Sequence, residues 1–275
     1  MLKKTTAYGL EFFYPASDTA VGPCLAQYGE FSVVLLDLLI DLTKQSGPST
    51  FVDVGANLGS ISLPFAKKLT DWKVTCIEAH SGLAGLLQTN ALLNELYNVD
   101  VIHAAAGPAR EIAEFPATSL MSKMNFGTIS IGYTSSPSVP TVMLTLDEIS
   151  PADTKLIRID VEDFEPQVMQ GAQRLLNAQN VTWIVEAAVN FPQTTLKTVK
   201  IFLDAGYDVY WFYVPFATPK STKDKPSNPL VGDANIVAQP KGSPNIWDLP
   251  KINIFTDPRP GSLAGYPYLL KYGYR

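Results

Sequence analysis

Cysteine, histidine and clustered positive charge are all scarce in this chain of 275 residues. Its two cysteines are Cys24 and Cys76, and Cys76 lies in a predicted buried strand, so the sequence indicates neither a disulfide framework nor a zinc site. The formal net charge is −5 at pH 7, and no basic stripe is present that would bind nucleic-acid phosphates. We therefore expect a protein of the reducing cytoplasm that binds no nucleic acid.

No hydrophobic run is long enough to predict a membrane span. The most apolar stretch, residues 31–42, is shorter than the roughly 20 residues that a bilayer requires. It carries Asp37 and Asp41 four residues apart on one helical face, which is typical of an amphipathic core helix, and we expect that helix from about residue 28 to residue 44. The N-terminal lysines are not followed by an apolar segment, so we expect no signal peptide and no membrane partner.

A predicted strand, turn and helix follow one another between residues 51 and 69. Residues 51–59 are typical of a short buried strand that ends on a glycine-bearing turn, and residues 60–69 carry apolar side chains at four-residue spacing. Gly55 lets the backbone turn off the strand, and Gly59 lets the helix pack closely on the sheet, as in a dinucleotide fingerprint. The pattern predicts a nucleotide-type cofactor site.

The middle glycine of that fingerprint is missing, which bears on the choice of cofactor. Asn57 stands where a pyrophosphate would need bare backbone, and Asp53 adds a carboxylate that repels a diphosphate and suits a cation. The site therefore fits the sulfonium and ammonium groups of S-adenosylmethionine better than NAD. Glu78 ends the next apolar run, where an acid can accept hydrogen bonds from both ribose hydroxyls.

Four segments together resemble the FkbM family of S-adenosylmethionine-dependent methyltransferases of class I. They are Val-Asp-Val-Gly-Ala-Asn at 52–57, Cys-Ile-Glu at 76–78, Thr-Leu-Asp at 145–147 and Leu-Ile-Arg-Ile-Asp-Val-Glu-Asp-Phe-Glu at 156–165. The resemblance covers residues 18–240. The chain departs from the family at Asp163, where the family usually has glycine, and this affects backbone conformation and charge beside the methyl-transfer site.

The resemblance implies an α/β fold with a doubly wound, Rossmann-like sheet that is mostly parallel. We expect the last strand, residues 235–238, to be antiparallel. Residues 1–45 would form an N-terminal cap and helix, residues 46–240 the S-adenosylmethionine-binding core, and residues 241–275 a C-terminal extension. The extension is rich in proline and aromatic residues, and we expect it to pack on the core or on a partner subunit.

The resemblance also assigns residues to the cofactor. The residues expected at its methionine portion and ribose are Asp53, Gly55, Asn57, Gly59 and Glu78. Ala105 belongs to a run of small residues that leaves room for adenine or, alternatively, packs tightly in the core. Glu30 corresponds to a family position near the methionine end, or else is a solvated acid in a helix's first turn.

Acidic residues gather where two predicted parallel strands end and therefore face the ligand crevice. They are Asp160, Glu162, Asp163 and Glu165 after one strand, and Glu186 at the end of the next. We expect Asp160 and Glu162 to lie beside the methyl group, where Asp160 also contacts the cofactor. Glu186 is expected to support the acceptor. These three residues are the catalytic candidates. The alternative for Glu162 and Glu165 is helix capping and first-turn electrostatics.

A metal remains an alternative at the same strand ends. Asp160, Glu186 and Asn190 resemble the magnesium ligands of catechol O-methyltransferase in their placing, although the FkbM resemblance does not require Mg²⁺. A hydroxyl acceptor can lose its proton either to a carboxylate directly or with the help of such an ion.

Three further polar residues have weaker assignments. We expect His103 to be a hydrogen-bonded core residue and His80 to be an exposed loop residue, so neither is a catalytic candidate. Residues 124–131 alternate enough to predict a strand, and Asn125 within it is either a cofactor or substrate contact or a turn residue.

The sequence thus predicts an S-adenosylmethionine-dependent methyltransferase that acts on a hydroxyl of a small molecule or a sugar-containing metabolite. An N-methyltransferase of the same fold needs no strong base if the amine arrives neutral. A non-catalytic protein that binds S-adenosylmethionine is a further alternative, favoured by Asp163 in place of the family's glycine. An NAD-dependent oxidoreductase would have the same turn, but its pyrophosphate would need the middle glycine that this chain lacks. A small-molecule or glycan acceptor is expected, and a homo-oligomer is left open.

Overall fold

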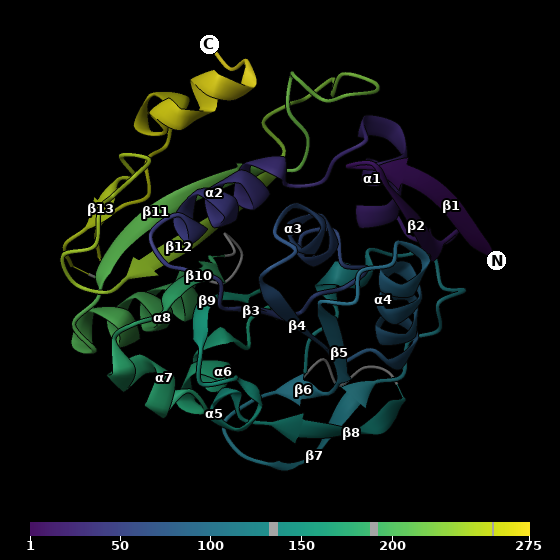
Figure 1. Cartoon of the computed structure of the whole chain (residues 1–275), viewed down its shortest axis with the longest axis horizontal. Coiled ribbons are helices and arrows are strands. Elements are labelled where there is room, and N and C mark those ends of the chain that lie inside the picture. The colour runs from purple at the N-terminus through teal and green to yellow at the C-terminus, as the bar shows by residue number, and fades with distance from the viewer. Residues whose placement is uncertain (132–136, 188–191, 255) are drawn as a thin grey trace.

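The centre of the protein is an eight-stranded sheet, shown in Figure 1 by a computed structural model that describes residues 1–131, 137–187, 192–254 and 256–275. In spatial order the strands are β13 (Lys251–Ile252), β11 (Asp208–Pro215), β12 (Gly232–Gln239), β10 (Thr182–Glu186), β9 (Thr154–Ile159), β3 (Thr50–Val54), β4 (Lys73–Glu78) and β5 (Val99–His103). The five strands from β10 to β5 are parallel, whereas β12 is antiparallel to β10 and β11. The predicted mostly parallel sheet with an antiparallel last core strand is confirmed.

Helices cover both faces of this sheet, as expected for a doubly wound fold. They are α1 (Val21–Tyr28), α2 (Val33–Thr43), α3 (Ser62–Lys68), α4 (Ser81–Leu93), α5 (Leu146–Ile149), α6 (Glu165–Gln170), α7 (Gln173–Ala178) and α8 (Pro192–Asp204). Figure 1 shows α3 and α4 on one side of the sheet and α6, α7 and α8 on the other. All five residues of β3 are therefore buried, and three of them, Phe51, Val52 and Val54, are apolar.

The helix predicted at residues 28–44 is instead two helices. Gly29 follows α1 with a left-handed φ of 75°, and Ser32 precedes α2 with a φ of 55°. Glycine adopts this conformation without steric cost, so the first helix ends here and the chain turns. Among the described residues no single helix is long and apolar enough to cross a membrane. Only the pair of α1 and α2, taken together, has the length and composition of a membrane span, and the two helices are bent by 88° relative to each other.

The C-terminal extension packs on the core, one of the two expected alternatives. β13 pairs with β11, and the 3-10 helices η2 (Leu263–Gly265) and η3 (Pro267–Tyr272) follow. The Trp247 indole donates a hydrogen bond to Asp41 at 2.9 Å, and the Tyr272 hydroxyl donates one to Asp37 at 2.9 Å. The acidic face of α2 therefore anchors the extension, whose aromatic rings, such as those of Trp247 and Tyr268, pack against one another.

Two smaller sheets complete the fold. The hairpin of β1 (Leu2–Ala7) and β2 (Leu10–Pro15) packs on α1 and α4, and β6 (Ala105–Ala106), β8 (Ser138–Leu144) and β7 (Glu111–Pro116) form a three-stranded sheet. The strand predicted at residues 124–131 was wrong, because this segment contains the 3-10 helix η1 (Phe126–Thr128). The Asn125 side chain accepts a hydrogen bond from the Gly127 N–H at 2.9 Å, which stabilises the turn.

Candidate active site

A cavity opens at the carboxyl ends of β3, β4, β9 and β10, where a doubly wound sheet binds its ligands. Together with its open mouth it spans about 1150 Å³, in the size range of small-molecule and cofactor sites. Most of the predicted site residues line it, namely Gly55, Asn57, Glu78, Ala105, Asp160, Glu162 and Glu186. The predicted residues Glu30, Asp53 and Gly59 do not.

The turn after β3 forms one wall of the cavity. Gly55 has a φ of 78°, and a Cβ atom there would lie 1.8 Å from the backbone oxygen of Asp160, so only glycine allows β3 and β9 to end this close together. Gly59 has a φ of 81° and faces Leu63 and Leu87 instead of the cavity. It therefore allows α3 and α4 to pack closely, and it lies outside the cavity lining.

Glu78 lies at the tip of β4 and is 7% exposed. Its Oε2 accepts a hydrogen bond from the Asn57 N–H at 2.9 Å, and its Oε1 accepts one from the His80 N–H at 2.8 Å. Burial raises the pKa of this carboxyl to about 7. The backbone thus holds the carboxylate at the cavity with lone pairs left for ligand hydroxyls.

His80 was expected to be exposed and His103 to be buried, and the structure shows the reverse. His80 is buried: its Nδ1 accepts hydrogen bonds from the first turn of α4, and its Nε2 lies 2.7 Å from the Thr118 carbonyl oxygen. His103 is exposed, with Nε2 3.1 Å from the Ala79 carbonyl oxygen. A histidine that caps a helix cannot be recognised from strand periodicity, because the cap depends on where the preceding strand ends.

Small and aromatic residues line the cavity next to Glu78. Ala104, Ala105 and Ala106 are buried there, and Phe115 and Phe126 lie along the same cavity. The combination makes an apolar wall of the cavity, which both alternatives for the small-residue run, room for adenine and tight core packing, allow. Asn125 also lines the cavity while it caps η1, so its turn role is observed and contact with a ligand is open to it.

Asp53 lies beneath the cavity in a buried charge network. It is fully buried, and its Oδ1 is 3.0 Å from Nη1 of Arg158, the neighbouring residue on β9. Its Oδ2 accepts a hydrogen bond from the Ser62 hydroxyl. Asp53, which was expected to face the cofactor, therefore does not line the cavity, because its carboxylate is buried against Arg158 and Ser62.

Arg158 is a site residue that sequence reasoning missed. It forms ion pairs with Asp53 and with Asp160, so it connects the buried strand to the cavity wall. Alternate residues of a strand share a face, and this places Arg158 and Asp160 on one side of β9. The signal was present in the sequence, since Arg158 is a cation that stands between apolar residues, Leu156 and Ile157 before it and Ile159 after it.

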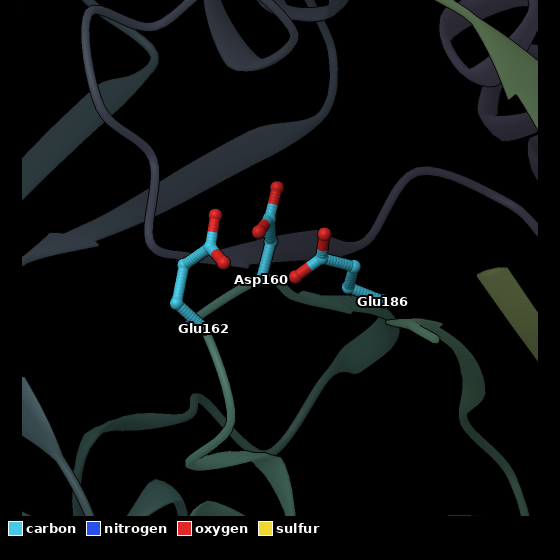
Figure 2. Close-up of side chains that lie close together, drawn as sticks. All are labelled: Asp160, Glu162 and Glu186. Atoms are coloured by element: carbon cyan, nitrogen blue, oxygen red, sulfur yellow. The ribbon is translucent and has the colours of Figure 1, made fainter. Parts of the chain in front are cut away.

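Asp160, Glu162 and Glu186 form a group that we call the carboxyl cluster. One oxygen of each lies within 4.8 Å of the others, and Figure 2 shows the three side chains converging. Burial is the main cause that raises the pKa of both Glu162 and Glu186, and repulsion from the nearby carboxylate of Asp160 is the second. The structure thus brings the three catalytic candidates together, with acids that bind protons more tightly than ordinary glutamates.

Two other predicted acids turn away from the cavity. Glu165 lies in the first turn of α6, as the alternative of first-turn electrostatics expects, and it accepts a hydrogen bond from the Val161 N–H at 3.2 Å. Asp163 has a φ of 71°, which explains the glycine usual in the family, and its carboxylate accepts a hydrogen bond from the Thr194 hydroxyl. The departure at Asp163 therefore adds no charge to the cavity lining.

Glu30 is neither a solvated acid nor part of the cavity lining. It is 5% exposed, lies between α1 and α2, and accepts a hydrogen bond from the Thr218 N–H at 2.6 Å. Burial raises its pKa. Its neighbour Phe31 does line the cavity and stacks on Phe216, with ring centroids 5.2 Å apart. Asn190, the third predicted metal ligand, lies outside the described residues.

Asp233 is a second residue that sequence reasoning missed. It lies at the start of β12, lines the cavity, and burial raises its pKa to about 7. The sequence places it at the end of a long loop. Because β12 is antiparallel, its first residues meet the carboxyl ends of the parallel strands, and only the pairing of β12 with β10 shows this.

These buried acids predict that stability falls as pH rises from about 5 to 8. The folded state keeps Glu78 protonated up to about pH 7, whereas the unfolded chain releases that proton near pH 4.5. The folded state therefore binds more protons in this window, and the free energy of unfolding decreases by about 2 to 3 kcal/mol from this group. Urea unfolding at pH 5 and pH 8 measures the difference, and Glu78→Gln should reduce it. A stability that rises over this range would contradict the prediction.

Comparisons with known proteins identify the family. A family model described as the methyltransferase FkbM domain matches residues 53–209. No curated protein matches the chain significantly. A solved S-adenosylmethionine-dependent methyltransferase from Agrobacterium tumefaciens is 12% identical with a TM-score of 0.50, covering 87% of this chain and 70% of its own, which shows a shared fold.

Two other solved structures are similar at lower TM-scores. A methyltransferase FkbM from Methylobacillus flagellatus is 15% identical with a TM-score of 0.47, covering 70% of this chain and 43% of its own. A precorrin-6y C5,15-methyltransferase from Geobacter metallireducens is 17% identical with a TM-score of 0.47, covering 75% of this chain and 86% of its own. Because the family model spans more than half of the residues, the chain belongs to the FkbM methyltransferase family and has the class I fold of S-adenosylmethionine-dependent methyltransferases.

Proposed function

We propose that the protein transfers the methyl group of S-adenosylmethionine to a hydroxyl of a small-molecule or sugar-containing acceptor. The observation that carries this proposal is that one cavity joins two sets of groups. The β3 turn and Glu78 suit the nucleoside and amino acid parts of the cofactor, and the carboxyl cluster at the adjoining strand ends suits an acceptor that must lose a proton. The cavity can therefore hold donor and acceptor side by side, which is the main requirement for methyl transfer.

The cofactor would lie along the β3, β4 and β5 ends. Glu78 would accept hydrogen bonds from the ribose hydroxyls, and the slot beside Ala105 would hold adenine. The methionine portion would meet the turn at Gly55 and Asn57, whose backbone approaches the cavity without bulky side chains. The positively charged sulfonium would then face Asp160.

The acceptor would lie against the N-terminal cap. Val21, Cys24, Phe31 and Phe216 form an apolar wall of the same cavity, with the two phenylalanine rings stacked at 14°. Such a wall suits an acceptor with an apolar or sugar face. The raised pKa values of Glu162 and Glu186 mean that either group, once ionised, holds a proton more tightly than an ordinary glutamate, which suits an acceptor hydroxyl that must lose its proton and is not needed by a neutral amine. This favours oxygen over nitrogen as the methylated atom.

Thermal unfolding with candidate ligands tests the cofactor. S-adenosylmethionine and S-adenosylhomocysteine at a hundred times their dissociation constants add about 2.7 kcal/mol, which for this size raises the Tm by roughly 5 to 10 °C. NAD at the same concentration is the control and should have no effect. A shift with NAD alone would overturn the proposal.

Pairs of hydroxyl and amino acceptors test whether oxygen or nitrogen is methylated. Catechols, sugars and other hydroxyl compounds are offered beside their amino analogues, and release of S-adenosylhomocysteine is followed for each pair. Turnover with hydroxyl compounds is expected, and turnover confined to the amines would replace O-methylation by N-methylation.

Glu78→Gln should weaken the binding of S-adenosylhomocysteine by about 10- to 100-fold. The amide offers one acceptor oxygen in place of two, while Asn57 and His80 already direct N–H groups at this side chain. A hydrogen bond to a charged group contributes about 1.5 to 3 kcal/mol. Isothermal titration calorimetry measures the affinity, and Glu111→Gln, at an exposed glutamate, is the matched control. Equal affinities for both variants would exclude Glu78 from the ribose site.

A further inference from the structure

We propose that the carboxyl cluster binds a divalent cation that prefers oxygen ligands, such as Mg²⁺ or Mn²⁺. One carboxylate oxygen from each of Asp160, Glu162 and Glu186 lies within 4.8 Å of the other two, so a single ion can contact all three. Figure 2 shows the three carboxylates directed at a common space from neighbouring strand ends. Carboxylate oxygens are the ligands such ions take in proteins, at about 2.0 to 2.6 Å.

An unpartnered buried oxygen gives independent support. Glu186 is 9% exposed, and its Oε2 has no hydrogen-bond partner within the described part of the chain. A carboxylate oxygen that is removed from water without a partner is costly. A cation in the common space would satisfy this atom and join it to the other two carboxylates.

The charge balance of the cavity also calls for a cation. Of the described residues that line it, Arg158 is the only lysine or arginine. Its terminal nitrogens already pair with Asp53 and Asp160. Asp160, Glu162, Glu186 and Asp233 all line the same cavity, so carboxyl groups that can ionise outnumber cationic side chains there. A divalent ion offsets this excess more fully than a sulfonium with one charge can.

The site adds a specific chemistry to the cavity. An ion held by three carboxylates keeps further coordination positions for ligand oxygens, and there it would hold the acceptor hydroxyl and lower its pKa. This role rests on the proposed function, whereas binding of the ion does not. The two are therefore tested separately.

Mn²⁺ titration of the full chain, freed of metal with EDTA, tests the site. The electron paramagnetic resonance signal of free Mn²⁺ measures binding, and Mg²⁺ and Ca²⁺ are added as competitors. We expect one equivalent of Mn²⁺ to bind, and at least tenfold weaker binding by Glu162→Gln and by Glu186→Gln. Asp71→Asn, at an exposed carboxylate, is the control and should bind as the unchanged chain does.

Thermal unfolding separates loss of the site from loss of the fold. Without metal, Glu186→Gln should melt at the same or a higher temperature, since the amide removes repulsion from a crowded carboxylate. Mn²⁺ should raise the Tm of the unchanged chain and leave that of the variant unaltered.

Absence of Mn²⁺ binding, or binding by both glutamine variants equal to that of the unchanged chain, would overturn the proposed ion site. If S-adenosylhomocysteine still binds in that case, the proposed function stands without the ion. Mn²⁺ binding without nucleotide binding would instead support the ion site and contradict the proposed function.

Discussion

Replacing Arg158 with methionine is expected to lower the free energy of unfolding by about 3 to 5 kcal/mol. Methionine preserves much of the side chain's apolar length but leaves Asp53, which is fully buried, without its positive partner at 3.0 Å. Removing one partner of a buried ion pair costs this much because the remaining charge stays out of water. For a chain of this size the Tm should fall by roughly 10 °C. Urea unfolding measures the free energy directly.

Two further variants separate this network from a general effect of charge. Asp53→Asn in the Arg158→Met background should recover part of the loss, because it removes the charge left unpaired. Lys200→Met breaks the exposed pair of Lys200 with Asp204 and should change stability by less than about 0.5 kcal/mol. If Arg158→Met costs no more than Lys200→Met, the buried network does not stabilise the fold.

Gly55→Ala is expected to lower stability by about 3 kcal/mol or more and to reduce S-adenosylhomocysteine affinity at least 100-fold. The added Cβ would lie 1.8 Å from the Asp160 backbone oxygen, and the φ of 78° is unfavourable for alanine. Overpacking costs about 1 to 3 kcal/mol and a left-handed residue about 1 to 2 kcal/mol more. Since the clash separates the ends of β3 and β9, it also distorts the cavity wall. Calorimetric titration and thermal unfolding measure the two losses.

Gly85→Ala is the matched control for this substitution. Gly85 lies in α4, and a Cβ atom there would meet no atom within 4 Å. Alanine favours a helix over glycine by up to about 1 kcal/mol, so this variant should be neutral or slightly more stable. If both variants bind the nucleotide equally well, the close approach at Gly55 is not required for the site.

The sequence predicted the sheet and the position of its ligand edge well, and it did less well where the chain changes direction. Hydrophobic periodicity and glycine placement are local properties, and they identified β3, its turn and the acidic end of β9. The break at Gly29 divided a predicted helix, and the side chain of Asn125 converted a predicted strand into a 3-10 turn. In both places local backbone chemistry prevailed over an apolar pattern that suits either structure.

By itself the sequence determined the order of the central parallel strands, the family resemblance, and the carboxyl groups at the ends of β4, β9 and β10. The tertiary structure decided which polar groups face the cavity. It placed Asp53 against Arg158 below the cavity, buried Glu30 against Thr218, and brought Asp233 to the carboxyl cluster through the antiparallel β12. The reason is physical: strand alternation fixes the face of a side chain, but its partner comes from whichever strand or loop packs beside it, often far away in the sequence.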